Sequence, residues 1–305
     1  MAPENFVDSP PIKQQHLDYL AAERPDTTDD NSMAEDYNIE DFYAWALEPC
    51  FPLFKTIAPA PKQNLKITLH HFLHPEVFYY SLHAVGGELN PVQSDGRGAG
   101  MLAPGLELDD SAFSSTWPSF LPTEIELCIT NPEDAIVASP GKFLVDGKAI
   151  CFVKMYQHGD TNIALCELEN YKRIMESNLD PDIRICRLLA VAKDDENKFI
   201  GLLLTYVECG FLTLACAVHD TPDSTKQKWV DQVTGTLTQL HQAGIVWGNA
   251  KPDNVLLDKK DDAWIIDFGG GYTWGFVERE KAGTMDGDLD GLEKIVEYVF
   301  RERAE

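Results

Sequence analysis

Apolar and polar residues begin to alternate regularly at about Thr123, and the first pattern that follows is that of strands. Strands are predicted at 125–130, 142–145, 148–156, 184–193 and 198–207. Asp146-Gly147 separates the second of these segments from the third, and this pair favours the two-residue turn of a hairpin. A sheet is therefore expected in this part of the chain.

Helical spacing appears between and after these strands. The segment 161–177 predicts one helix, and Ser224 with Gln227 has the spacing of a capping box at the start of another. That helix should end at Gly244, and its apolar face carries Trp229, Val230, Val233, Leu237 and Leu240. A short hairpin is expected over 254–267. The last helix, from Asp288, has one stripe made of Leu289, Leu292, Ile295, Val296, Val299 and Phe300. This order indicates an α+β chain with two lobes.

The patterns before residue 121 are weaker, and we expect an N-terminal extension there. Residues 1–38 are polar and acidic, which favours disorder in part, although 12–22 fits a short helix. A further helical pattern stops at Pro49 and Pro52, and the segment 86–105, rich in Gly, Pro and Ser, indicates a loop. The predicted divisions are 1–38, an extension over 39–120, and a domain over 121–305 with lobes at about 121–207 and 208–305.

Charge and composition exclude some classes of partner. The 305 residues include 50 acidic and 25 basic side chains, a net charge of −25. Nucleic acids and anionic membranes are bound by clustered Lys and Arg, so neither is expected as a partner. No run reaches the roughly 20 apolar residues that span a bilayer, and no secretory signal is visible. Seven scattered cysteines without a CxxC pair indicate a reducing, cytoplasmic setting.

Four polar positions occur in a recognisable order. Lys154 lies late in a strand, Glu167 lies in the next helix, and Asn254 follows Asn249 in the loop WGNAKPDN. Asp267 then begins the tripeptide DFG after a strand. In this order and context the chain, from about Thr123 onward, resembles the protein-kinase superfamily. It is most similar to small, divergent kinase-like proteins of fungi, some of which have WGDAKPDN-type loops.

The resemblance implies a two-lobe protein-kinase-like fold with a truncated C-lobe, and it implies ATP and Mg²⁺ as cofactors. Lys154 would neutralise the phosphates and Glu167 would hold it in place, while Asp267 and Asn254 would supply hard oxygen ligands to Mg²⁺. Leu204 would occupy the gatekeeper position of the adenine pocket. The resemblance also assigns the backbone facing adenine to Thr205, Tyr206 and Val207, and the support of the catalytic loop to Asp288.

Departures from the family pattern bear on function. Asn249 stands where kinases have the aspartate that accepts the proton of the substrate hydroxyl, and an amide cannot take that proton near pH 7. Gly248 replaces an arginine that pairs with an activation-loop phosphate in many kinases. The Gly-rich loop is absent, so that only backbone amides near 139–142 are expected to approach phosphate. Because 18 residues, 270–287, separate DFG from Asp288, the usual peptide-docking platform should be missing.

Three functions follow from this reading. The first is an atypical phosphotransferase that acts on a small molecule, for which the acidic C-lobe favours a cationic substrate. The second is a pseudokinase scaffold that binds a protein partner through its N-terminal extension. The third is a kinase fold used for another transfer, nucleotidyl or acyl, in a biosynthetic pathway. A metal site at His70, His71 and His74 and a nucleophilic cysteine are weaker candidates, since such side chains are more often structural.

Overall fold

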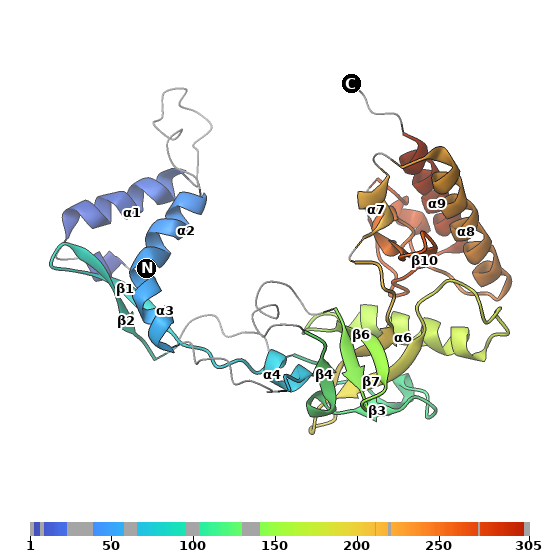
Figure 1. Cartoon of the computed structure of the whole chain (residues 1–305), viewed down its shortest axis with the longest axis horizontal. Helices are drawn as coiled ribbons and strands as arrows, with labels where there is room; N and C mark the ends of the chain where they lie inside the picture. The colour runs from blue at the N-terminus through green and yellow to red at the C-terminus, as the bar shows by residue number, and fades with distance from the viewer. Residues whose placement is uncertain are drawn as a thin grey trace. The chain divides into compact units, whose positions relative to one another are not determined.

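A computed structural model describes residues 3–6, 9–22, 39–57, 66–95, 104–129, 141–210, 212–218, 221–273 and 275–301 (Figure 1). The chain divides into two compact units. The smaller unit comprises Met1–Leu65 and Pro75–Met101, and the larger unit comprises Lys66–His74 and Leu102–Glu305. Within the described residues, no helix is long and apolar enough to cross a membrane. The acidic stretch 23–36, for which disorder was expected, lies outside the described residues.

A six-stranded sheet in the order β3-β7-β8-β6-β5-β4 is the centre of one half of the larger unit. Its strands are β3 (Ser119–Phe120), β4 (Ile125–Leu127), β5 (Phe143–Val145), β6 (Ala149–Met155), β7 (Leu188–Lys193) and β8 (Phe199–Thr205). Neighbouring strands are antiparallel except β3 and β7. The predicted β5–β6 hairpin is confirmed, since Asp146 and Gly147 both have the positive φ, 53° and 63°, that its tight turn requires.

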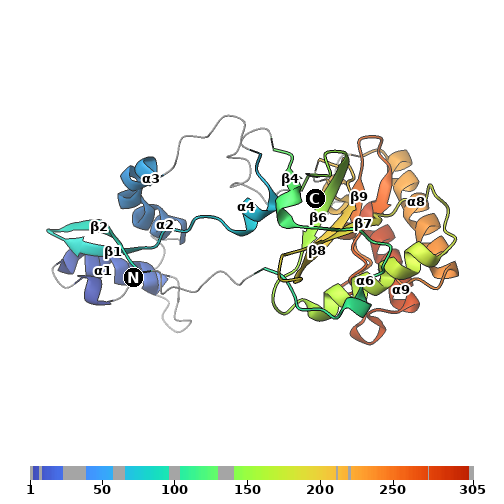
Figure 2. The same cartoon turned by 90° about the horizontal axis from the view of Figure 1, so that it is seen from below.

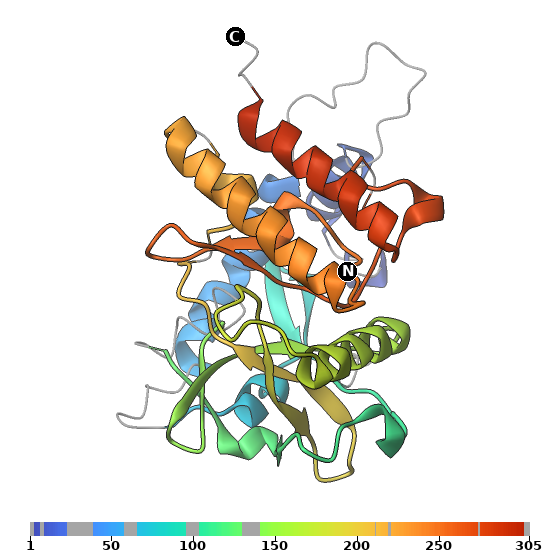
Figure 3. The same cartoon turned by 90° about the vertical axis from the view of Figure 1, so that its right-hand side faces the viewer.

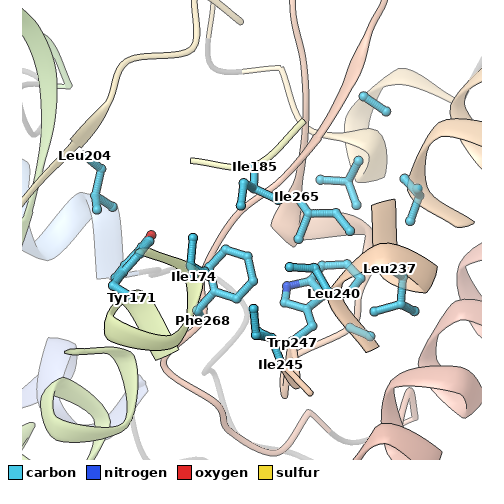
Figure 4. Packing of buried hydrophobic residues seen from close by; sticks show 14 of the residues in the cluster. Tyr171, Ile174, Ile185, Leu204, Leu237, Leu240, Ile245, Trp247, Ile265 and Phe268 are labelled. Carbon is cyan, nitrogen blue, oxygen red and sulfur yellow. The ribbon is translucent and has the colours of Figure 1, made fainter. Parts of the chain in front are cut away.

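Side chains from the two faces of β8 enter two different apolar clusters. Leu203 packs in the first, together with Leu69 of α4 (Leu69–Leu73) and side chains of β4, β5 and β6. Leu204 belongs to the second, which continues through α6 (Thr161–Glu176) into the helical half of the unit. Figure 4 shows this second cluster, with Tyr171 of α6 close to Phe268. The α6 helix therefore packs against both halves of the larger unit.

Helices and a short hairpin form the other half of the larger unit. Its elements are α7 (Leu214–Ala217), α8 (Asp223–Gln242), β9 (Val255–Leu257), β10 (Ala263–Ile265) and α9 (Met285–Phe300). Helices α8 and α9 run side by side (Figure 3). Gly244, with φ of 74°, follows the end of α8 as predicted. These elements and the curled sheet make the mixed α+β architecture with a small second lobe that the sequence predicts.

Two details of these helices differ from the prediction. Pro222 is the N-cap of α8 and no side chain caps that end, so Ser224 and Gln227 lie inside the helix and form no capping box. The apolar stripe of α9 is narrower than predicted, because Leu289 and Phe300 are 52% and 38% exposed. Both lie at the margin of the stripe in a helix of about 3.6 residues per turn.

The described residues of the smaller unit form helices and a hairpin (Figure 2). They are α1 (Pro10–Ala22), α2 (Ile39–Leu47), α3 (Phe51–Ile57), β1 (Tyr80–Val85) and β2 (Glu88–Gln93), with short 3₁₀ turns at Pro3–Phe6 and Glu48–Cys50. Two predictions are wrong here. Part of the expected loop 86–105 is a strand, because Gly86 and Gly87 form a turn that pairs β2 with β1. Pro52 lies in the first turn of α3, where its missing N–H costs no hydrogen bond, and ends no helix.

Two segments of the expected extension cluster with the larger unit. Leu106 forms an isolated bridge with Phe199, and Ser119 of β3 pairs with Val191 of β7. Thr68 forms a bridge with Glu126 in the same way. These segments cluster with the larger unit although they precede residue 121, where the sequence predicts the domain to begin. Backbone pairing of this kind cannot be predicted from residue patterns in segments this short.

Candidate functional site

A lysine between two carboxylates lies where the sheet meets the helical half. Lys154 is in β6, Glu167 in α6, and Asp267 follows β10. The Lys154 Nζ atom lies 2.7 Å from Glu167 Oε2 and 2.6 Å from Asp267 Oδ1. Three elements that are far apart in sequence therefore bring together the charged residues that the resemblance singled out.

Burial sets the protonation of this cluster. Glu167 is fully buried, and its Oε2 atom also accepts a 2.5 Å hydrogen bond from the Tyr156 hydroxyl. Burial raises the pKa of Glu167, while Lys154 and Tyr156 act to lower it. Burial alone would lower the pKa of Lys154, but the two carboxylates beside it raise that pKa overall. The ammonium therefore keeps its charge, which is the form that can neutralise an anion.

Backbone geometry positions Asp267. Its φ of 64° lies in the left-handed region that non-glycine residues rarely adopt. The following Phe268 is fully buried, and its carbonyl accepts a 2.7 Å hydrogen bond from the Asn170 side chain of α6. Strained backbone held by its surroundings is common at functional sites, and here it directs the carboxylate toward Lys154.

Both polar atoms of the Asn249 side-chain amide form hydrogen bonds. Its Nδ2 donates to Asp267 Oδ2 at 3.2 Å, and its Oδ1 accepts from the Thr273 hydroxyl at 3.3 Å. Lys251 donates in turn to Thr273 Oγ1 at 3.3 Å, while Asn254 donates to the Asn249 carbonyl at 2.9 Å. Asn249 and Asn254 therefore both lie at the Lys154–Asp267 cluster, and Asn249 acts toward Asp267 as a donor.

A cavity of about 340 Å³ opens beside this cluster. It is lined at one end by Lys154, Glu167, Asn254 and Asp267, and along its walls by Gly141, Phe152, Cys186, Leu204, Thr205, Tyr206, Val207, Cys209, Thr213, Leu256 and Ile266. Lys154, Asn254, Asp267 and the segment 204–207, which were expected to contact the cofactors, thus line one cavity. The backbone N–H of Thr205, however, donates a hydrogen bond to the Arg187 carbonyl. This N–H group is therefore not a free donor to a ligand in the cavity.

Asp288 holds the loop that carries Asn249. Its buried carboxylate accepts hydrogen bonds from the backbone N–H groups of Trp247 and Gly248, each at 2.7 Å, and lies 3.0 Å from His241 Nε2. Gly248 has φ of 79°, and a Cβ there would lie 3.2 Å from the Gly270 Cα. A tight backbone approach therefore accounts for glycine at the position where many kinases have arginine.

Other predicted residues lie away from the cluster or outside the described part. Of the segment 139–142, only Gly141 and Lys142 are described, and Gly141 lines the cavity. His71 accepts hydrogen bonds from Thr68 as part of a helix cap, and the described residues contain no group of three or more His, Cys, Asp and Glu side chains that could hold a metal ion. All seven cysteines are free.

Four residues of the site were not predicted. Tyr156 lies two residues after Lys154, so the alternation of a strand places both on one face, and this signal was present. Lys251 stands within the quoted WGNAKPDN loop. Asn170 and Thr273 left no comparable signal, because only the folded chain brings them to Phe268 and Asn249.

Comparison with known proteins agrees with this geometry. Residues 150–283 match the model of a family described as the protein kinase domain. Over 73 residues the chain is 42% identical to the serine/threonine-protein kinase PKH3 of Eremothecium gossypii. The matched residues make up 23% of this chain and 10% of that protein. It is 27% identical over 85 residues to Rho-associated protein kinase 1 of Homo sapiens, covering 28% of this chain and 6% of that protein.

A probable serine/threonine-protein kinase of Dictyostelium discoideum is 31% identical over 86 residues, covering 28% of this chain and 13% of its own length. The chain thus spans only a small fraction of the length of these relatives. The residues matched by the family model, 150–283, include Lys154, Asn249 and Asp267.

Proposed function

We propose that this chain, whose residues 150–283 match the protein kinase domain model, binds Mg·ATP and acts as an atypical phosphotransferase on a small molecule. One observation carries the proposal: Lys154 is held between Glu167 and Asp267 at the end of a cavity that Leu204 to Val207 line. The cavity lining combines apolar side chains with charged groups, which suits a ligand with a flat ring and an anionic tail.

The residues present fit the proposed cofactors. Phe152, Leu256 and Ile266 are apolar side chains on the cavity wall, as a nucleotide base requires, and Lys154 is a cation that phosphate oxygens would attract. Asp267 and Asn254 offer carboxylate and amide oxygens, the hard ligands that Mg²⁺ prefers. When bound, the metal and nucleotide would supply the transferable phosphoryl group and neutralise its charge.

Each protein residue then has a distinct part. Glu167 and Tyr156 keep Lys154 in place, and Asp288 keeps the Asn249 loop in place. Asn249 can orient a substrate hydroxyl by hydrogen bonding but cannot accept its proton at neutral pH. Since phosphoryl transfer depends mostly on positioning and charge, such a site would be slow but not inactive.

The amide of Asn249 also supports a second function, that of a pseudokinase scaffold. Its Nδ2 is bonded to Asp267 and its Oδ1 to Thr273, so both ends are engaged in holding the site. A residue used in this way could preserve a nucleotide-dependent shape without catalysis. Transfer of a nucleotidyl or acyl group remains a third hypothesis, and it would need no base at this position.

Calorimetric titration with ATP, with and without Mg²⁺, tests the proposal. We expect metal-dependent binding that weakens by at least about tenfold in Lys154→Met and Asp267→Asn, because each loses a charged hydrogen bond. Lys148→Met is the matched control, since this lysine lies in the β5–β6 turn with a side chain that is 83% exposed. Absence of binding at millimolar ATP would rule the proposal out.

If ATP binds, α- and γ-labelled ATP distinguish the functions. Label from the γ-phosphate in a small-molecule product supports phosphotransfer, and label from the α-phosphate supports nucleotidyl transfer. Binding without any transfer supports the scaffold.

A further inference from the structure

An apolar stripe lies on the surface of the smaller unit. Five side chains of α2 and α3 form it: Ile39, Tyr43, Leu47, Phe51 and Phe54, with exposed fractions of 44, 57, 45, 52 and 42%. Single exposed apolar residues are ordinary on protein surfaces, but a contiguous row of large ones marks an interaction site.

The five residues lie along one helical run, 39–57. The 3₁₀ turn Glu48–Cys50 joins α2 to α3, and both flanking residues, Leu47 and Phe51, have right-handed helical backbone. Ile39, Tyr43 and Leu47 follow one another at i, i+4 spacing on one face of α2, and Phe51 and Phe54 lie at i, i+3 spacing on one face of α3. Figure 2 shows α3 following α2. We call this row the α2–α3 stripe.

A different face of α2 packs against α1. Phe42 and Trp45 pack against His16 and Tyr19 of α1, with ring centroids 5.4 to 6.3 Å apart. The helix therefore has two apolar faces, although contact with α1 requires only one. The α2–α3 stripe is the apolar face that does not pack against α1 and stays exposed.

Charge indicates what the stripe would bind. Glu40, Asp41 and Glu48 are exposed on α2 and in the turn that follows it. The sequence of the smaller unit, 1–65 and 75–101, holds 15 acidic and 5 basic side chains. Such a surface repels a second copy of itself and anionic lipid, and it attracts cations. The complementary ligand is an amphipathic helix whose apolar face is bordered by Lys and Arg.

We propose that the α2–α3 stripe is a docking site for a basic amphipathic helix of another protein. The apolar residues of that helix would pack on Leu47 and Phe51 at the middle of the stripe, and its Lys and Arg would face Glu40 and Glu48. This interaction is independent of the phosphotransfer proposed above, since it needs no residue of the Lys154 cluster.

The probe is a fluorescein-labelled, 20-residue synthetic helix with Leu at i, i+3 and i+4 spacing and Lys at its other positions. Fluorescence anisotropy with the full-length chain should show saturable binding that weakens at least about tenfold in Leu47→Asp/Phe51→Asp and on raising the salt. The matched control is Phe300→Asp, which changes an exposed aromatic residue of α9 and should leave binding unchanged. Circular dichroism confirms that each variant is folded.

Reversing the charge of Glu40 and Glu48 distinguishes binding at a specific site from non-specific binding. Glu40→Lys/Glu48→Lys should weaken binding of the Lys helix and strengthen binding of a second probe with Glu in place of Lys. The proposal is overturned if the Lys helix fails to bind or binds wild type and the Asp variant equally. It is also overturned if light scattering shows a dimer that the Asp variant abolishes, since the occupant would then be a second copy.

Discussion

The two units differ in where they place apolar side chains. In the larger unit they fill two clusters, and the charged residues Glu167 and Asp288 are buried with partners. In the smaller unit the buried apolar residues are Phe6, Tyr19, Cys50 and Ala84, whereas more than half of the exposed large apolar side chains of the described residues belong to it. The larger unit therefore has an extensive apolar core, while the smaller unit leaves more of its large apolar side chains exposed.

The largest expected effect tests this contrast in packing. Leu237→Ala in α8 removes a side chain that is 1% exposed and should cost about 2–5 kcal/mol of unfolding free energy, because it leaves a cavity. Leu47→Ala in the stripe should cost less than about 0.5 kcal/mol. Urea unfolding of both variants measures the difference. Equal losses would show that the stripe is covered in the folded chain.

A medium effect is expected from the charges inside the larger unit. In Asn249→Asp a second carboxylate would lie beside Asp267, where the amide Nδ2 now donates at 3.2 Å. We expect a melting temperature about 2–4 °C below that of Asn249→Ala in EDTA, since the repulsion costs about 1 kcal/mol. Mg²⁺ should reduce this gap.

Thermal melts of both Asn249 variants with and without Mg²⁺ measure that effect. If Asn249→Asp is as stable as Asn249→Ala in EDTA, Asn249 does not position Asp267 as the hydrogen bond indicates. If Mg²⁺ leaves the gap unchanged, the paired oxygens do not form a cation site.

The smallest expected effect is a pH dependence. Burial raises the pKa of Asp288 above its ordinary value of 3.8, although its hydrogen bonds lower it in part. The folded chain therefore binds this proton more tightly than the unfolded chain does. As pH rises from 3.8 through the raised pKa, the contribution of Asp288 to stability falls.

Unfolding free energy measured against pH in wild type and Asp288→Asn checks this sign. The variant should lack that decrease. Glu48→Gln, on the surface of the smaller unit, should keep the wild-type profile. A wild-type profile in Asp288→Asn would mean that Asp288 does not titrate differently on folding.

Much of the larger unit was predictable because its signals are local. The Asp146-Gly147 turn, the apolar face of α8 and the β9–β10 hairpin depend on neighbouring residues, and the structure confirms them. The wrong prediction of a loop over 86–105 came from residues that occur both in loops and in the turns and edge strands of hairpins. Gly86 and Gly87, followed by Pro91, predict a loop, yet the paired β2 strand contains that proline. It is tolerated because β2 pairs only with β1 in a two-stranded sheet, which leaves one side of the strand unpaired.

The sequence by itself determined which residue types are present in the candidate site and in what order they follow one another, from Lys154 and Glu167 to Asn249, Asn254 and Asp267. Only the tertiary structure decided that Asn249 donates to Asp267, that Thr273 and Tyr156 complete the cluster, and that the stripe of α2 and α3 is exposed. The physical reason is distance along the chain. Turns and helix faces arise between near neighbours, whereas side-chain contacts and exposure depend on segments that folding brings together from far apart.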